Sequence, residues 1–393
     1  MNPITQGAIC MIKSAITGAP CPIPEGISLR DVQQLMLQQR ILAMGYIGAI
    51  NSGYPSENKL MLYLLDQYCC AVLHSERQME QVAKISQAFD QNGIDHMPVK
   101  GSIMKAIYPN PELRTMSDAD ILIRQEQYPQ IVPIMKQLGF KETGESDHEH
   151  IWVHEHLKVE LHKRLIPSYN TDLYSYFGEG WDLAKTCKGH CWAMSQEDSF
   201  IYNFIHFAKH FRDGDVNCRF VIDLWVHLRH CPELDLTYIR KQMEKMKMEV
   251  FYDNIMQLLA VWFDDAPWDE KTQRITEVLF NTDTQDLKEI HTIAQNARVA
   301  QQTGSTKQLK RTQFWNRAFP SREHMDWSYP KWKKTPLPIA WMLRWGDLLI
   351  NRRDVIKNRQ EEMDTVTTQA IEKYRQDLEY VGLQFSDNVA LPE

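Results

Sequence analysis

The segment Asp118–Ile123 places two carboxylates, one residue apart, in front of a short apolar run. A run of this length, bounded by polar residues, is typical of a strand that is buried at one end. Because side chains alternate along a strand, Asp118 and Asp120 are expected on the same face of a sheet. Like charges at this spacing repel each other, so the fold must supply something that neutralises them.

The residues on either side of this strand predict a small mixed sheet. The predicted elements are a strand over 94–99, a short helix over 101–109, the strand over 118–123, a helix over 125–139, and an antiparallel hairpin formed by 148–156 and 157–165.

Helical periodicity precedes and follows this region. Apolar residues recur at three- and four-residue spacing in 29–50, 60–93, 197–211, 220–230, 236–263, 269–304 and 339–382. A chain of 393 residues is too long for one small core. We therefore expect an α+β protein with a helical N-terminal segment over 1–92, a mixed-sheet core over 93–194 and a helical C-terminal domain over 195–393.

Composition excludes several classes of protein. The net charge of −7 argues against a binding surface for duplex nucleic acid, which needs a basic face. No apolar run approaches the roughly 18 residues of a spanning helix, and the N-terminus lacks the pattern of a signal peptide. The eight cysteines include the adjacent pair Cys69-Cys70, a poor arrangement for a disulfide framework. These features predict a cytoplasmic protein with no membrane partner.

A third acid is expected close to the first two. Glu160 lies in the second half of the predicted hairpin, and a neighbouring strand can bring it beside Asp118 and Asp120. A cluster of three carboxylates binds hard divalent cations, and Mg²⁺ in particular combines a few carboxylates with substrate phosphates. Two such ions can activate an attacking oxygen and stabilise a leaving one.

The segment before the two aspartates offers contacts for phosphate. The turn at Gly101-Ser102 presents backbone N–H groups and a hydroxyl. Lys100 and Arg114 can add positive charge opposite a triphosphate. Metal and nucleotide together would then neutralise the two aspartates.

The order Gly101-Ser102, Asp118-x-Asp120 and a later lone Glu160 resembles the DNA polymerase beta-like nucleotidyltransferase superfamily. Within it, the chain is similar to a bacterial family of uncharacterised nucleotidyltransferases. That similarity rests on Lys100-Gly101, Tyr108-Pro109, Arg114, the two aspartates, the His-rich segment 206–210, Arg219 with Asp223, and the tail 319–345.

The resemblance implies a role for each matching residue. Asp118 and Asp120 would be metal ligands, and Glu160 a third ligand or the base that accepts a proton from the acceptor hydroxyl. Gly101 and Ser102 would hold the nucleotide phosphates. The sequence departs from the superfamily pattern in having Lys100 directly before the glycine and the small Ala119 between the aspartates.

The expected reaction is transfer of a nucleoside monophosphate from an NTP, with ATP the expected nucleotide, to an acceptor hydroxyl. Mg²⁺ is the expected cofactor, as one or two ions, with Mn²⁺ as a substitute. The acceptor would be a small molecule or a protein. Two alternatives stay open: a nucleotide-binding regulatory module without turnover, and a toxin–antitoxin-type enzyme acting on protein or tRNA.

Several polar residues have both a functional and a structural interpretation. His206, Lys209 and His210 either face the nucleotide or acceptor, or make hydrogen bonds between helices. Arg219 is a further candidate contact, or forms an ordinary helix ion pair with Asp223 four residues later. His162 is expected to be a hydrogen-bonded structural residue.

Overall fold

The computed structural model describes residues 1–146, 148–167, 171–281, 288–294, 296–297, 311, 315, 318–322, 325, 329–351 and 366–384. Parts of the predicted helices 269–304 and 339–382, and part of the tail 319–345, lie outside the described residues.

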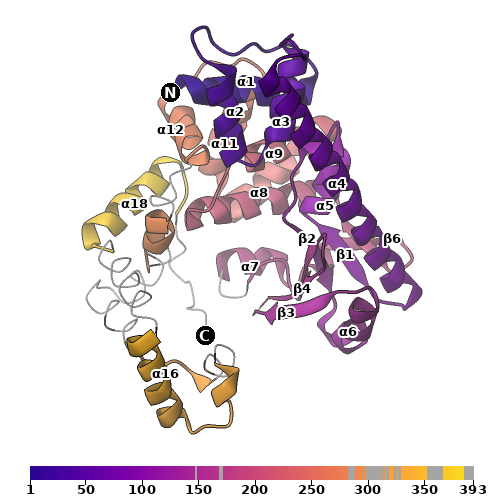
Figure 1. The fold of residues 1–393 in the computed structure, drawn as a ribbon, viewed down its shortest axis with the longest axis vertical. Helices are drawn as coiled ribbons and strands as arrows, with labels where there is room; N and C mark the ends of the chain where they lie inside the picture. Colours follow the sequence, from indigo (N-terminus) through magenta and orange to yellow (C-terminus); the bar gives the residue numbers. More distant parts are fainter. Residues whose placement is uncertain are drawn as a thin grey trace. The chain divides into compact units, whose positions relative to one another are not determined.

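The described elements follow the order that the sequence predicts: helices come first, then a region that contains the strands, then more helices (Figure 1). The helices before and within the sheet region are α1 (Pro3–Thr17), α2 (Leu29–Gln38), α3 (Leu42–Asn51), α4 (Lys59–Gln91), α5 (Gly101–Ile107), α6 (Tyr128–Gln137) and α7 (Thr171–Phe177). The strands are β1 (His96–Val99), β2 (Asp118–Ile123), β3 (Lys141–Glu145), β4 (Glu149–Val153), β5 (Lys158–His162), β6 (Ala184–Lys188) and β7 (Cys191–Met194). The later helices are α8 (Gln196–Asp213), α9 (Arg219–His230), α10 (Leu236–Lys245), α11 (Glu249–Phe263), α12 (Glu270–Leu279), α16 (Leu337–Asn351) and α18 (Thr368–Tyr380).

The chain packs into two compact units. The first is built from 1–210 and 216–282, and the second from 211–215 and 283–391, apart from the last two residues. In the second unit, Ile293, Ala297, Val366 and Ile371 form a small buried apolar cluster. Every predicted site residue belongs to the first unit.

One seven-stranded sheet forms the centre of the predicted core, with the strand order β3-β4-β5-β2-β1-β7-β6. The pairs β2–β5 and β1–β7 are parallel, whereas β1–β2, β3–β4, β4–β5 and β6–β7 are antiparallel. The α+β class is therefore confirmed.

One face of the sheet is covered by α4 and α6. Ala119, Ile121 and Ile123 of β2 belong to a buried cluster that also contains Phe89 of α4 and Ile131 of α6. Burying an aliphatic or aromatic side chain of this kind contributes about 1.5–3 kcal/mol. Because β2 alternates, its other face carries the two aspartates away from this core.

The local signals placed several elements correctly. The strand predicted over 118–123 is confirmed as β2, and the predicted hairpin is confirmed as the antiparallel pair β4–β5. The helix predicted over 60–93 is confirmed as α4, which ends at Gln91, with Asn92 as its C-cap and Gly93 following at φ 71°. The segment 29–50 forms two helices, because Arg40 between them has φ 59°, which no helix residue adopts.

Three strands were missed. β3, with the sequence KETGE, and β6, with AKTCK, are mostly exposed and lack the apolar alternation that marks a half-buried strand. β7 is short and half-buried. Among the residues that the structure describes, no helix is both long and apolar enough to cross a membrane.

Candidate active site

The register of β2 and β5 brings the three predicted acids together. Asp120 lies directly opposite Glu160, and Asp118 lies opposite Lys158. All four side chains are on the face of the sheet that α4 and α6 do not cover. One donor atom each from Asp120, Glu160 and His162 lies within 4.8 Å of the others.

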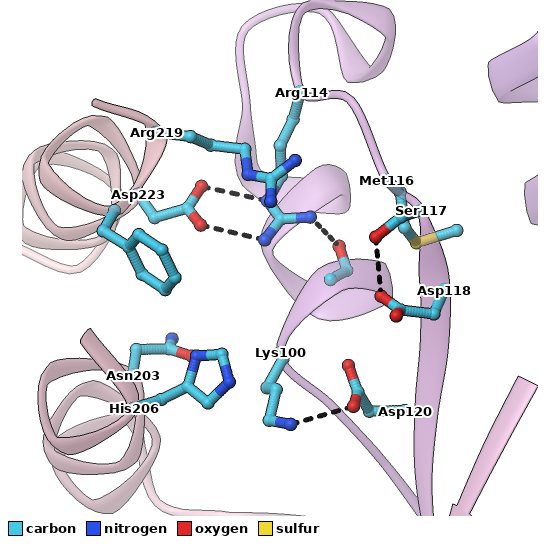
Figure 2. Close-up of a pocket in the computed structure, with 12 residues that line it drawn as sticks. Lys100, Arg114, Met116, Ser117, Asp118, Asp120, Asn203, His206, Arg219 and Asp223 are labelled. Carbon is cyan, nitrogen blue, oxygen red and sulfur yellow. Dashed lines mark hydrogen bonds and ion pairs between the residues drawn. The ribbon is translucent and has the colours of Figure 1, made fainter. Parts of the chain in front are cut away.

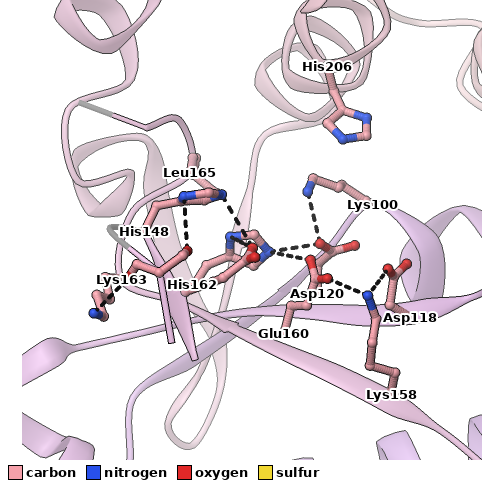
Figure 3. Close-up of polar contacts among 12 residues, drawn as sticks. Lys100, Asp118, Asp120, His148, Lys158, Glu160, His162, Lys163, Leu165 and His206 are labelled. Atoms are coloured by element: carbon pink, nitrogen blue, oxygen red, sulfur yellow. Dashed lines mark hydrogen bonds and ion pairs between the residues drawn. The ribbon is translucent and has the colours of Figure 1, made fainter. Parts of the chain in front are cut away.

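Side-chain cations neutralise the carboxylates in this structure (Figure 3). Lys158 Nζ lies 2.9 Å from Asp118 Oδ2 and 2.6 Å from Glu160 Oε1. Lys100 Nζ lies 2.8 Å from Asp120 Oδ1, and His162 Nε2 approaches the same oxygen to 2.8 Å. Lysine side chains of the protein therefore offset the repulsion that was expected between the carboxylates.

Asp120 is the most strongly held of the three acids, and only 5% of it is exposed. Burial alone would raise the pKa of Asp120, but Lys100 and the hydrogen bond from His162 outweigh it and hold this pKa well below its usual value. In the same way, burial opposes the charge of Lys100, yet Asp120 raises the pKa of Lys100 above its ordinary value. Both groups are thus ionised at neutral pH.

Lys100 occupies an unusual backbone conformation between β1 and α5. Its φ of 49° and ψ of −113° lie in a region that side-chain-bearing residues rarely adopt. Its ammonium also lies 5.8 Å from the centre of the Tyr202 ring. In this backbone conformation the Lys100 ammonium pairs with Asp120.

A pocket opens beside Asp118 and Asp120, between β2 and α5 on one side and α8 and α9 on the other (Figure 2). Its lining residues are Lys100, Gly101, Arg114, Met116, Ser117, Asp118, Asp120, Asn203, His206, Arg219, Phe220 and Asp223. Five of the predicted nucleotide or acceptor contacts, Lys100, Gly101, Arg114, His206 and Arg219, therefore line the same pocket as the two aspartates.

Arg114 is held by a buried carboxylate from α9. Its Nε and Nη2 donate to Asp223 Oδ1 and Oδ2 at 2.9 and 2.8 Å, and Tyr108 also donates to Oδ1 at 2.7 Å. Its Nη1 donates to the Gly101 carbonyl at 3.2 Å. Burial opposes the charge of Arg114, but Asp223 outweighs it and raises the pKa of the guanidinium. This network fixes the start of α5 against α9.

Gly101 and Ser102 are both buried at the start of α5. A Cβ on Gly101 would lie 3.1 Å from Met116 Cγ and 3.2 Å from Arg114 Nη1, so the close packing of Arg114 favours glycine there. Ser102 does not line the pocket, and its hydroxyl is buried with no hydrogen-bond partner among the described residues.

Arg219 makes contacts of a different kind. Its Nη1 donates to the carbonyl and the hydroxyl of Thr115 at 3.0 and 3.2 Å. Asp223, four residues later, is bound by Arg114 instead. Within the described part of the chain, Arg219 has no carboxylate within ion-pair distance, so its charge is available to an anion in the pocket.

The three predicted contacts on α8 are not equivalent. His206 lines the pocket, and its Nε2 lies 3.0 Å from that of His210 one turn later. Burial, Lys100 and His210 hold the pKa of His206 well below its usual value, so its ring is neutral. Lys209 and His210 do not line the pocket.

Sequence analysis did not identify Lys158, His148 and Glu149 as site residues, nor four residues that line the pocket: Met116, Ser117, Asn203 and Phe220. The pairing of β4 with β5 places Glu149 opposite His162, next to Glu160. Burial and the nearby Glu160 raise the pKa of Glu149. Burial and His162 lower the pKa of His148 to about 3. Strand alternation places Glu149 and Ile151 on one face, and the antiparallel pairing sets Ile151 opposite Glu160. This pairing is the signal that could have identified Glu149.

The donor chemistry of this face fits a hard divalent cation. Asp118, Asp120 and Glu160 supply carboxylate oxygens from adjacent strands, the ligand type that Mg²⁺ prefers. The ammonium of Lys158 already lies between Asp118 and Glu160, so their geometry accommodates a cation. The residues therefore fit the metal that the resemblance implies.

Comparison with known families agrees with this arrangement. The family model described as an uncharacterised nucleotidyltransferase matches residues 26–264, which include every residue lining the pocket. The chain belongs to this family. Membership supports nucleotidyl transfer as the general activity and an NTP as a substrate. No curated protein and no solved structure matches the chain.

Proposed function

We propose that this protein transfers a nucleoside monophosphate from an NTP to an acceptor hydroxyl, releases pyrophosphate and requires Mg²⁺. The observation that carries the proposal is the register that sets Asp120 opposite Glu160, on the sheet face where Asp118 and the pocket also lie. Family membership supports the same class of reaction.

In this proposal Asp118, Asp120 and Glu160 hold one or two Mg²⁺ ions, for which Mn²⁺ can substitute. Bound metal supplies positive charge to the phosphate oxygens and to the attacking and leaving oxygens. Lys158 keeps the carboxylates paired in the absence of metal and moves aside on its flexible stem, since its side chain is 37% exposed. The mixed-sheet core over 93–194 thus carries the metal ligands.

The triphosphate binds in the pocket lined by residues of β2, α5, α8 and α9. Arg219 is the principal cationic contact, because its described partners are neutral groups of Thr115. Lys100 and Gly101 add contacts near Asp120, and Arg114 contributes charge while it holds the pocket wall through Asp223. Ser102 follows Gly101 at the start of α5, but its buried hydroxyl does not line the pocket. ATP is the proposed nucleotide.

Glu160 accepts the proton of the acceptor hydroxyl. Its neighbour Glu149 and the cation Lys158 lie on the same face and keep this side chain in a polar environment. A general base must be within hydrogen-bond reach of the proton that it removes. The acceptor would therefore approach between β5 and α8, where His206, Lys209 and His210 supply polar contacts.

The acceptor is proposed to be a small molecule or a protein. The net charge of −7 disfavours a duplex nucleic acid.

The test is incubation with each labelled NTP, Mg²⁺ and a cell extract, followed by separation into protein, RNA and small-molecule fractions. Label in the protein or small-molecule fraction with release of pyrophosphate is expected, and its loss in Asp118→Asn would link it to this site. Label in RNA alone would replace the proposed acceptor by tRNA. NTP binding without pyrophosphate release in any fraction would identify a regulatory module instead.

A further inference from the structure

A second group of donor atoms lies beside the carboxylate site, formed by His148, Glu149 and His162. We call it the histidine cluster. One ligand atom of each residue lies within 4.8 Å of the other two. Glu149 begins β4 and His162 ends β5, and the antiparallel register places these two residues opposite each other. His148, immediately before β4, lies on the far side of His162 from Asp118 and Lys158 (Figure 3).

The ring of His162 is held in one orientation by Asp120. Its Nε2 lies 2.8 Å from Asp120 Oδ1, and a carboxylate can only accept, so Nε2 carries the proton. In the neutral ring, Nδ1 then presents a lone pair. Only 2% of His162 is exposed, and Nδ1 is buried with no hydrogen-bond partner among the described residues. This is the arrangement in which histidine ligates a metal, with a carboxylate fixing its other nitrogen.

The Nδ1 of His162 lies near two other potential metal ligands, Glu149 and His148. Its Nδ1 lies 3.9 Å from Glu149 Oε2, which is too long for a hydrogen bond. His148 Nε2 lies 3.3 Å from the same oxygen, and the two imidazole centres are 5.9 Å apart. With metal–ligand distances of about 2.0–2.2 Å, two donors on one ion are separated by roughly 3.0–3.9 Å for bond angles between about 90° and 140°. The two distances to Glu149 Oε2, 3.9 and 3.3 Å, fall in this range, and the ligand atoms of the two histidines lie within 4.8 Å of each other.

Two imidazoles and one carboxylate suit divalent transition metals such as Zn²⁺, Mn²⁺ or Co²⁺, whereas Mg²⁺ takes oxygen ligands. We propose that His148, Glu149 and His162 bind a divalent transition-metal ion at a site separate from the Mg²⁺ site of Asp118, Asp120 and Glu160. Asp120 connects the two sites, because it ligates one metal and orients the histidine of the other. Metal binding by the histidine cluster rests on donor geometry alone, whereas its separation from a Mg²⁺ site rests on the proposed function.

Co²⁺ is the probe for this site, because its visible absorption reports nitrogen ligation directly. Full-length protein freed of metal is titrated with Co²⁺ in the presence of excess Mg²⁺, which occupies the carboxylate site. We expect saturable binding of one ion that Zn²⁺ displaces and Mg²⁺ does not. Complete competition by Mg²⁺ would show a single oxygen site and overturn the proposal.

His148→Ala is the decisive variant, because His148 is only half-buried and its loss should leave the protein folded. Removing a carboxylate that only hydrogen-bonds to a metal ligand lowers metal affinity about 10- to 100-fold. Removing His148, which is itself a proposed ligand, should lower Co²⁺ affinity at least as much. Glu149→Gln should have an effect in the same direction. Unchanged melting temperatures would confirm that these variants are folded.

Two control variants separate the site from its surroundings. His156→Ala removes a histidine from the turn between β4 and β5, outside the cluster, and should leave Co²⁺ affinity unchanged. Asp118→Asn should also leave it unchanged, although nucleotide turnover would be lost. If His148→Ala binds Co²⁺ with wild-type affinity and spectrum, the histidine cluster is not a metal site. If Co²⁺ binds as expected but no NTP is turned over, only the proposed function fails.

Discussion

Lys158 lies directly opposite Asp118 across the parallel strands β2 and β5, with its ammonium 2.9 Å from Asp118 Oδ2. The same ammonium lies 2.6 Å from Glu160 Oε1, so it bridges two of the proposed metal ligands. An ammonium and a divalent ion cannot occupy the same position between these oxygens. Lys158 is therefore expected to compete with Mg²⁺.

Replacing Lys158 should separate metal affinity from metal-free stability. In Lys158→Met, Mg²⁺ should raise the melting temperature at lower concentrations than in the wild type, because no ammonium must be displaced. Without metal, the variant should melt lower, because like charges are left close together. Lys163→Met is the control, since Lys163 pairs with Glu145 instead. An unchanged Mg²⁺ midpoint in Lys158→Met would refute the competition.

The two aspartates should respond differently to the same substitution. Asp120→Asn leaves the ammonium of Lys100, 13% exposed, without its carboxylate. Breaking such a buried pair costs about 3 kcal/mol or more. Asp118→Asn should change the unfolding free energy by less than about 0.5 kcal/mol, because Asp118 is more exposed and Lys158 keeps Glu160 as its partner. Urea unfolding in metal-free buffer measures the unfolding free energy of both variants. Equal losses would contradict the assignment of Asp120 as the more buried and more strongly paired aspartate.

The stabilisation from Asp120 should also depend on pH. Its pKa is lower in the folded protein than the ordinary 3.8, so the stabilisation is present above that pH and is lost as pH falls through the folded-state pKa. The difference in unfolding free energy between wild type and Asp120→Asn should therefore narrow below about pH 3.8. A constant difference would mean that the loss comes from packing.

Glu160→Gln distinguishes a general base from a metal ligand. As a base, Glu160 contributes about 10²–10⁴-fold to the rate, and its amide should preserve NTP and Mg²⁺ binding while transfer is lost. As a ligand, its loss should weaken Mg²⁺ binding, and higher Mg²⁺ should partly restore the rate. We expect the first pattern to dominate in a Mg²⁺ titration of transfer. Wild-type turnover at ordinary Mg²⁺ would remove Glu160 from the site.

The two arginines of the pocket should have opposite signatures. Arg219→Ala should weaken NTP binding by about 10- to 100-fold, the value of a hydrogen bond to a charged group, with little change in stability. Arg114→Ala should lower the unfolding free energy by about 3–5 kcal/mol, because it leaves Asp223 buried and unpaired. Calorimetric NTP titration and urea unfolding check the pair. If Arg219→Ala lowers stability without weakening NTP binding, Arg219 has a structural role and is not the nucleotide contact.

His227 on α9 should make stability sensitive to acid. Burial and His230 lower its pKa to about 4, from the ordinary 6.5. The unfolded chain binds this proton first, so stability should fall as pH drops from about 6.5 to 4, by up to about 1.4 kcal/mol per pH unit. In His227→Gln this slope should decrease by that amount, whereas in His230→Gln it should decrease less, because burial, the larger cause of the lowered pKa of His227, remains. Equal slopes in both variants would contradict the prediction.

Local patterns predicted the strand β2, the hairpin β4–β5 and the shared face of Asp118 and Asp120, because strand alternation depends only on neighbours in sequence. They also placed Glu160 on a neighbouring strand, which the parallel pairing of β2 and β5 confirms. Strand order and register depend on contacts between distant segments. The sequence therefore could not show that Lys158 faces Asp118.

The ion pair of Arg114 illustrates the same limit. Asp223 follows Arg219 at helical spacing, so an ion pair within α9 was one of the two interpretations of Arg219. The structure pairs Asp223 with Arg114 instead, 109 residues earlier, because the start of α5 packs against α9. The mostly polar edge strands β3 and β6 escaped prediction because hydrogen bonds to a neighbouring strand, rather than buried side chains, define them.

The backbone at Lys100 has an evolutionary consequence. A residue held at φ 49° and ψ −113° costs on the order of 1–3 kcal/mol, which glycine would largely avoid. Glycine at this position would therefore be stabilising in any relative whose Asp120 does not need a nearby cation. We expect relatives with glycine there to carry a replacement cation near Asp120, or to have lost the aspartate. Lysine and aspartate at these two positions should be inherited together.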